Sequence, residues 1–124
     1  MKHLHEKNEQ YATPDREILD SFPNPGVIQV TLTQGEFTSL CPLTGQPDYA
    51  EIEIKYGPKE LCIESKSLKL YLSAYRNFGG FAETIAKMIC EDLYEVLKPK
   101  YIQVNGRFVS RGGISIDAFV TRSE

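Results

Sequence analysis

Alternating apolar and polar residues are clearest in the segment AEIEIKY, residues 50–56. Its alanine, isoleucines and tyrosine alternate with two glutamates and a lysine, the pattern of a strand with one buried and one solvated face. Extended segments of similar character predict strands at 27–32, 101–108 and 114–120. After the strand predicted at 50–56, GPKE predicts a turn and LCIE predicts a further length of extended chain.

Two segments follow the helical repeat instead. Leu68, Leu72 and Tyr75 fall on one face of a first helix, for which Ser67 is a suitable N-cap. The sequence NFGG ends this helix, and a second one follows with Gly80 as its expected N-cap and a proline after its last turn. The second helix carries an apolar stripe formed by Phe81, Ile85, Met88, Ile89, Val96 and Leu97.

The resulting order, ββααββ, predicts an α+β domain in which two helices cover one face of an antiparallel sheet. We assign residues 1–25, which end in FPNPG, to an irregular N-terminal arm and residues 26–124 to a single domain. So small a unit leaves its sheet edges open, and open edges favour assembly with copies of the same chain.

Composition narrows the class of protein. A chain of 124 residues with 41% hydrophobic content suits one domain with a modest core. Its formal charge of −3 argues against binding nucleic acid through bulk charge. We find no apolar run long enough to span a membrane and no apolar segment of a signal peptide near the N-terminus, so we expect a cytoplasmic location.

The three cysteines are widely spaced and predict free thiols in a reducing compartment. Cys41 lies in FTSLCPLTGQPDYA, between strands, where reactive groups concentrate, and Asp48 follows in the same segment. A cysteine is more often a small buried hydrophobe, and an aspartate after GQP more often a turn residue, so the residues alone leave both interpretations open. We expect Cys62 and Cys90 to be structural. The only two histidines are among the first five residues, so no metal site is predicted.

Several charged residues have two interpretations each. Glu83 falls in the first turn of the second helix, where an acid favours the helix dipole, and Glu64 suits a solvated strand end. Lys66 and Lys69 share a helix face, where they can be solvated or meet a phosphate. Arg111, in SRGGISID, is open to the same two roles. Composition and spacing therefore end at an α+β domain with one candidate nucleophile.

The segments LCPLTGQPDYA, ESKSLKLY, YRNFGGFAE and RGGISID together closely resemble the short, single-module NADPH-dependent 7-cyano-7-deazaguanine reductases, the nitrile reductases of queuosine biosynthesis. The likeness runs from about Phe37 to Asp117, and ESKSLKLY fits the family signature over its full length. The resemblance implies a tunnelling fold, whose ββααββ units join into barrel-like rings with active sites between subunits.

The resemblance also implies an activity and its residues. It implies that NADPH, without a metal, reduces the nitrile of 7-cyano-7-deazaguanine to the aminomethyl group through a cysteine thioimide, in a tRNA-modification pathway. It assigns the nucleophile to Cys41 and the proton donor to Asp48. Where the family commonly has a histidine, this chain has an alanine at position 82. The implied substrate contacts are Ile63, Glu64, Ser65, Ala82 and Glu83, and the implied NADPH contacts are Lys66, Lys69 and Arg111.

Two alternatives stand beside this interpretation. One is an amidine-forming relative that acts on the same nitrile with ammonia in archaeosine formation and needs no NADPH, although ESKSLKLY favours the reductase. The other is a non-catalytic module that binds a purine or pterin, because a fold does not fix a function. The expected partners are a small 7-deazaguanine and further copies of the chain, without direct contact to nucleic acid.

Overall fold

The long strands of the chain are Val30–Leu40 (β2), Pro47–Gly57 (β3), Tyr101–Arg111 (β5) and Ile114–Ser123 (β6). They form one antiparallel sheet in the order β2-β3-β5-β6 in a computed structural model that describes residues 14–124. Hairpins join β2 to β3 and β5 to β6, and β3 pairs with β5 in the middle of the sheet. The outer strands β2 and β6 therefore leave an open edge on each side of this sheet.

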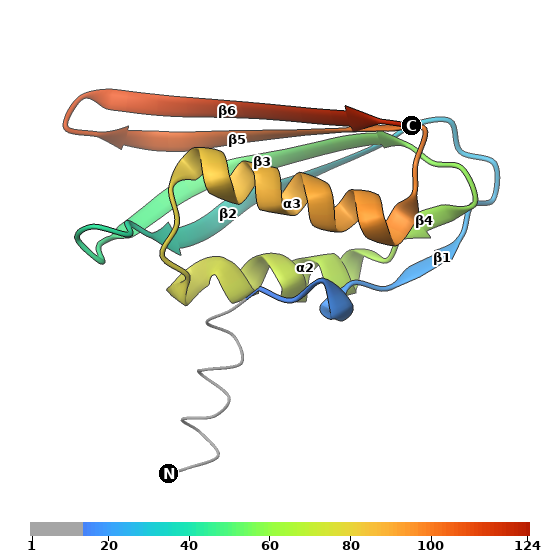
Figure 1. The fold of residues 1–124 in the computed structure, drawn as a ribbon, viewed down its shortest axis with the longest axis horizontal. Coiled ribbons are helices and arrows are strands. Elements are labelled where there is room, and N and C mark those ends of the chain that lie inside the picture. Colours follow the sequence, from blue (N-terminus) through green and yellow to red (C-terminus); the bar gives the residue numbers. More distant parts are fainter. Residues whose placement is uncertain (1–13) are drawn as a thin grey trace, which may run out of the picture.

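The helical layer lies between β3 and β5 in the sequence. It consists of the helices Ser65–Ser73 (α2) and Ala82–Leu97 (α3), with a 3₁₀ turn at Ala74–Asn77 (η2) directly after the first of them. Both helices lie on the same face of the sheet and run in opposite directions, and the other face of the sheet carries no helix (Figure 1). The two-layer α+β arrangement and the element order expected from the sequence are confirmed.

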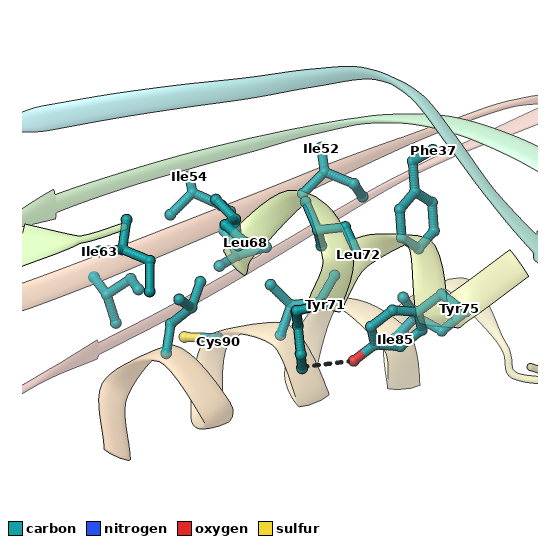
Figure 2. Packing of buried hydrophobic residues seen from close by; sticks show 14 of the residues in the cluster. Phe37, Ile52, Ile54, Ile63, Leu68, Tyr71, Leu72, Tyr75, Ile85 and Cys90 are labelled. Carbon is teal, nitrogen blue, oxygen red and sulfur yellow. Dashed lines mark hydrogen bonds between the residues drawn. The ribbon is translucent and has the colours of Figure 1, made fainter. Parts of the chain in front are cut away.

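The core fills the space between these two layers (Figure 2). The inward residues of β3 include Ile52 and Ile54, which are 0% and 1% exposed and face Leu68 and Leu72 of α2. Burying an isoleucine or leucine side chain contributes about 1.5–3 kcal/mol. The alternation in residues 50–56 thus corresponds to the physical division between the covered and uncovered faces of the sheet.

The first long strand differs from its expected extent. The pattern of residues 27–32 predicted a strand there, whereas β2 starts and ends later along the chain. A β-bulge interrupts its pairing with β3 just before Phe37. Beyond the bulge, Phe37 and Ser39 face the helices and are buried. The strand continues to Leu40, the residue before Cys41. A bulge breaks the alternation of side chains, which is why the sequence pattern ended too early.

The start of α2 also differs from its expected cap. Glu64, and not Ser67, is the N-cap, because its two carboxylate oxygens accept hydrogen bonds from the backbone N–H groups of Lys66 and Ser67. The hydroxyl of Ser67 is buried, donates to the carbonyl oxygen of Glu64 at 2.7 Å, and accepts the N–H of Asp20 at 2.9 Å.

The start of α3 lies one residue later than expected. Phe81 is the N-cap in place of Gly80, because its backbone is extended and its carbonyl oxygen accepts the N–H of Ile85 at 3.0 Å. Glu83 is therefore the second residue of the helix. Phe81 is 54% exposed and does not belong to the apolar stripe. The rest of the expected stripe is buried or partly buried: Ile85, Met88, Ile89, Val96 and Leu97.

A second, two-stranded sheet lies at the opposite end from the β2–β3 turn (Figure 1). It pairs Ser21–Pro23 (β1) with Leu61–Ile63 (β4), and a 3₁₀ turn at Arg16–Ile18 (η1) precedes it. Leu19, between η1 and β1, is 6% exposed and belongs to the core.

This sheet corrects the expectation of an irregular arm over residues 1–25. That expectation is wrong for residues 16–23, which hold η1 and β1, while residues 1–13 lie outside the described part of the chain. The segment is short and has a single fully buried apolar residue, so it carries no periodicity from which strand pairing could be predicted.

A chain of polar contacts, exposed at Arg16 and buried at the two tyrosines, ties this segment to both helices. The Arg16 guanidinium contacts the Asp92 carboxylate on α3 at 3.0 Å, and the hydroxyl of Tyr71 on α2 donates to the same carboxylate at 2.5 Å. The hydroxyls of Tyr71 and Tyr75 are hydrogen-bonded to each other at 2.8 Å (Figure 2). Burial, with the neighbouring tyrosine and carboxylate, raises the pKa of Tyr71 well above its usual value, so both hydroxyls remain neutral partners in this chain.

Candidate active site

The β2–β3 turn, residues 41–46, carries the candidate nucleophile Cys41 at one end of the sheet (Figure 1). The N–H of Cys41 donates to the carbonyl oxygen of Gln46 at 2.8 Å, and the carbonyl oxygen of Cys41 accepts the N–H of Gly45 at 2.9 Å. Gly45 has φ of +72°, in the left-handed region that glycine adopts without strain. These bonds close the turn and hold a half-buried thiol directly after β2.

The turn itself promotes ionisation of this thiol. Hydrogen bonding from the Thr44 hydroxyl, and then from the backbone N–H groups of Thr44 and Leu43, lowers the pKa of Cys41 below its usual value. These donors stabilise the thiolate more than the thiol. Burial and the negative charge of Asp48 act in the opposite direction and are outweighed. A partly exposed cysteine with a lowered pKa has the properties of a nucleophile.

The other two cysteines have the opposite character. All three are free thiols, but Cys62 and Cys90 are 4% and 0% exposed. Burial raises the pKa of Cys90 to about 11, so its thiol stays protonated near neutral pH. Both residues are structural, as the sequence predicted.

Asp48 lies on β3 close to the same turn and is bound by an arginine. Its carboxylate oxygen is 2.7 Å from Nε of Arg111, which is the last residue of β5. Nη1 of Arg111 also donates to the side-chain oxygen of Gln46 at 2.7 Å. The family resemblance implied that Arg111 contacts a phosphate of NADPH. In the structure Arg111 contacts the predicted proton donor and the turn that holds Cys41.

A loop pairing brings the start of α3 to the same end. The N–H of Leu40 donates to the carbonyl oxygen of Phe78 at 2.9 Å, and the N–H of Gly80 donates to the carbonyl oxygen of Leu40 at 3.1 Å. A Cβ atom at Gly80 would lie 2.8 Å from the Phe78 ring and 3.1 Å from the Ile85 side chain, so a larger residue would force these side chains to shift. Ala82, 8% exposed, and the exposed Glu83 follow directly, which places them on the same side as Cys41.

The remaining predicted contacts lie around the start of α2. The N–H of Ile63 donates to the Tyr56 hydroxyl at 2.9 Å, and Ile63 is buried. Glu64 is the helix cap, and the hydrogen bonds from Lys66 N–H and then Ser67 N–H lower the pKa of its carboxyl group. The side chains of three further predicted residues are exposed to solvent here: Ser65, Lys66 and Lys69.

The predicted residues therefore form two groups at opposite ends of the four-stranded sheet (Figure 1). Asp48 and Tyr56 are on the same strand, eight residues apart. At about 3.3 Å per residue this separation is about 26 Å, far longer than a fused two-ring heterocycle. A single ligand of that size cannot touch both the Cys41 group and the Glu64 group of one chain.

Each group has an open groove beside it. A groove of about 490 Å³ runs along the exposed side of α3 from Glu83 to Asp92. A second, of about 150 Å³, lies between β2 and α2, and its lining includes apolar residues of both elements together with Thr33, Gln34, Ser65 and Lys69.

In the described part of the chain, no cluster of three or more histidine, cysteine, aspartate or glutamate side chains is arranged to hold a metal ion. Within the same residues, neither α-helix combines the length and apolar character needed to cross a membrane.

Sequence reasoning missed two of the site residues. Thr44 and Gln46 are polar residues of a turn, and neither type is itself a signal of catalysis. The spacing of Thr44, three residues after Cys41 in a turn that ends near a glycine, was the one available hint.

The fold and the site define a two-layer α+β domain with a partly exposed cysteine of lowered pKa near a carboxylate. The family model for "QueF-like protein" matches residues 47–124, so the site and most of the sheet lie within or next to the match. The chain belongs to this family.

Curated relatives resemble the chain over most of its length. It is 49% identical over 123 residues to the NADPH-dependent 7-cyano-7-deazaguanine reductase of Helicobacter pylori strain J99, covering 97% of this chain and 83% of the relative. It is 52% identical over 106 residues to the reductase of the same name from Streptococcus thermophilus strain LMD-9, covering 83% of this chain and 65% of that one.

A solved structure with low sequence identity has the same fold. The archaeosine synthase QueF-Like, in its apo form, matches with a TM-score of 0.73 at 20% identity, over 77% of this chain and 94% of that one. The expected tunnelling fold is confirmed by this likeness, and the family resemblance is confirmed by the family model and the relatives.

Proposed function

We propose that the chain is an NADPH-dependent nitrile reductase that converts 7-cyano-7-deazaguanine to 7-aminomethyl-7-deazaguanine in queuosine biosynthesis. The observation that carries the proposal is Cys41, whose pKa is lowered by its own turn and which lies next to Asp48 in a family of reductases. A nitrile carbon accepts hydride poorly until a nucleophile has added to it, and a thiolate is such a nucleophile.

In the first step, the sulfur of Cys41 bonds to the nitrile carbon and one carbon–nitrogen π bond breaks. The nitrogen gains a proton and the thiol loses one, so the step is the addition of S–H across the triple bond. We assign to Asp48 the transfer of that proton between sulfur and nitrogen, because its carboxylate is close enough to act on the charge of the Cys41 thiol, and it would end the step unchanged. The product is a thioimide on Cys41.

The cofactor sites must supply cations for the phosphates of NADPH, which provides a hydride for each of the two reductions when bound. Lys66 and Lys69 fit this requirement, because both are exposed at the start of α2 and Lys69 reaches the groove beside β2. These lysines would hold and orient the cofactor. The sulfur of Cys41 leaves after the first hydride has arrived and so becomes available for another cycle.

Substrate recognition falls to both groups of residues. Glu83, exposed at the start of α3, can accept the ring N–H and the amino group of a guanine-like edge in a two-point contact. Ile63, Glu64 and Ser65 lie at the other end of the sheet, where the predicted NADPH contacts Lys66 and Lys69 also lie. Ala82 stands beside Glu83 where the resemblance has a histidine, so a proton-carrying group is replaced there by a methyl group.

The separation of about 26 Å between the two groups supports a site shared between subunits. The Cys41 end of one chain and the Glu64 end of a neighbour would complete one site. The open edge strands β2 and β6 offer the backbone groups through which copies of the chain could join into a barrel-like ring.

The deciding experiment mixes the purified protein with 7-cyano-7-deazaguanine, with and without NADPH. Intact mass reports the covalent adduct, and absorbance reports NADPH oxidation. We expect an adduct on Cys41 without NADPH, and oxidation of NADPH with release of the amine when the cofactor is added. The control is Cys41→Ala, which should form no adduct.

The same measurements separate the alternatives. An adduct that reacts with ammonia but never oxidises NADPH would identify an amidine-forming enzyme instead. Binding without any adduct would identify a non-catalytic module and overturn the proposal.

A further inference from the structure

The position of Arg111 is set by an irregularity in the β5–β6 hairpin. Phe108 pairs with Ile116 and Arg111 pairs with Ile114, so three steps along β5 match two steps along β6. The extra residue is a β-bulge in β5. Without the bulge, alternation would direct Arg111 away from the face that carries Phe108. With it, Arg111 faces the helix side of the sheet.

Asp48 lies on this same helix-facing side. It is opposite Ser39, which is buried at 0% exposure beneath the helices, and residues opposite each other in an antiparallel pair share a face. The side chains of Asp48 and Arg111 meet there, with 23% and 43% of their surfaces exposed. The bulge is therefore what allows the ion pair to form.

The hairpin turn fixes Arg111 closely. Gly112 and Gly113 form the turn with φ of +59° and +88°, the two positive values of a tight two-residue connection. Arg111 is the residue directly before this turn. It contacts the carboxylate of Asp48 and the side-chain oxygen of Gln46, whose carbonyl oxygen accepts the N–H of Cys41. One guanidinium thus holds both the proton carrier and the turn of the nucleophile.

We infer that Arg111 is a positioning residue for Asp48 and acts in adduct formation, before NADPH takes part. This role rests on the proposed function and differs from the phosphate contact that the sequence resemblance implied. A planar guanidinium fixes a carboxylate in place, and a small displacement of a catalytic group is enough to slow a reaction strongly.

The test measures adduct formation with no NADPH present, where a residue that only binds cofactor phosphates has no effect. We expect Arg111→Gln to slow adduct formation roughly ten- to a hundredfold, the scale of a misplaced catalytic group. Arg111→Lys should restore part of the rate, because it keeps the charge and loses the fork of donors.

Arg107 provides the matched control. It lies on β5 as well and contacts Glu51 at 2.8 Å and Glu53 at 3.2 Å, but on the face of the sheet opposite Asp48. Arg107→Gln removes an arginine–carboxylate pair of the same kind from the same strand. We expect the adduct rate of this variant to stay within about twofold of that of the unmodified protein, because Arg107 lies on the face of the sheet opposite Asp48. Its ion pairs at the surface also contribute little to folding stability.

A double variant tests whether Arg111 works through Asp48. Adding Arg111→Gln to Asp48→Asn should cause a much smaller loss than Arg111→Gln alone, because the carboxylate that Arg111 positions is already gone and only its contact with Gln46 remains to be removed. Melting temperatures of all variants establish that each is folded.

Two outcomes would overturn the inference alone. One is an unchanged cofactor-free adduct rate in Arg111→Gln together with a raised KM for NADPH, which would return Arg111 to the cofactor. The other is a full additional loss in the double variant. If the unmodified protein forms no adduct, the proposed function fails and this role of Arg111 fails with it.

Discussion

The proposed division of the site between two ends of the sheet predicts that inactive variants can complement each other. Cys41→Ala removes the nucleophile from one end, and Glu64→Ala removes a substrate contact from the other. The two ends are separated by about 26 Å along β3, so no single chain can use both for one ligand. Each variant alone should be inactive or nearly so, because in the proposed shared site one end comes from each of two neighbouring chains.

The expected recovery follows from counting subunits. In an equal mixture that assembles at random, half of the Cys41 ends and half of the Glu64 ends are intact. About a quarter of the shared sites then combine two intact ends, and activity should return to about a quarter of that of the unmodified protein. Glu64 is also the N-cap of α2, so its replacement by alanine should cost about 1 kcal/mol of stability and leave the fold intact.

The assay co-expresses the two variants with different affinity tags, isolates assemblies that carry both, and follows NADPH oxidation with 7-cyano-7-deazaguanine. The matched control pairs Cys41→Ala with Asp48→Asn. Both of these residues lie at the Cys41 end of the sheet, so every chain in this mixture has a damaged Cys41 end, and activity should not return.

Two results would refute the shared site. Equal recovery in the control mixture would mean that activity does not depend on which end is damaged. Failure of the Cys41→Ala and Glu64→Ala mixture to recover any activity, in assemblies shown to contain both chains, would mean that each site is built within one subunit.

Three further predictions concern single side chains. Thr44→Val removes the hydroxyl that most lowers the pKa of Cys41, so less thiolate is present at low pH and alkylation of Cys41 should begin at a higher pH. Tyr71→Phe removes the hydrogen bond to the Asp92 carboxylate and should lower the free energy of unfolding by about 1.5–3 kcal/mol in urea titrations. Glu83→Gln presents a donor to the donors of the guanine edge and should weaken binding of the substrate by about 1.5–3 kcal/mol in calorimetry; equal affinity would remove Glu83 from recognition.

Much of the fold could be read from local patterns. The alternation in residues 50–56 reflects a sheet with one covered face, and the helical spacing from Leu68 to Tyr75 reflects the face that α2 turns to the core. In β6 only Ala118 and Val120 of the alternating residues are covered, because Ile114 and Ile116 are exposed. These patterns are visible because burial of every second or every third to fourth residue is repeated along a whole element. The resemblance to a known family then identified Cys41 and Asp48, which no periodicity distinguishes from turn residues.

The tertiary structure decided the features that depend on pairing between distant segments. The bulge before Phe37 lies in the part of β2 that leads to the turn carrying Cys41, and the bulge in β5 directed Arg111 towards Asp48. A bulge changes which face a side chain occupies without leaving a regular signature in the sequence, so register had to be seen to assign these contacts.

The same holds for the arrangement of the site as a whole. Glu64 and Cys41 are only 23 positions apart in the sequence, yet β3 carries the chain from one end of the sheet to the other between them. The sequence by itself determined which residue types are present and which elements they form. Only the folded arrangement separated them into two ends, because the direction and length of a strand, and not the number of intervening residues, set the distance between its flanking loops.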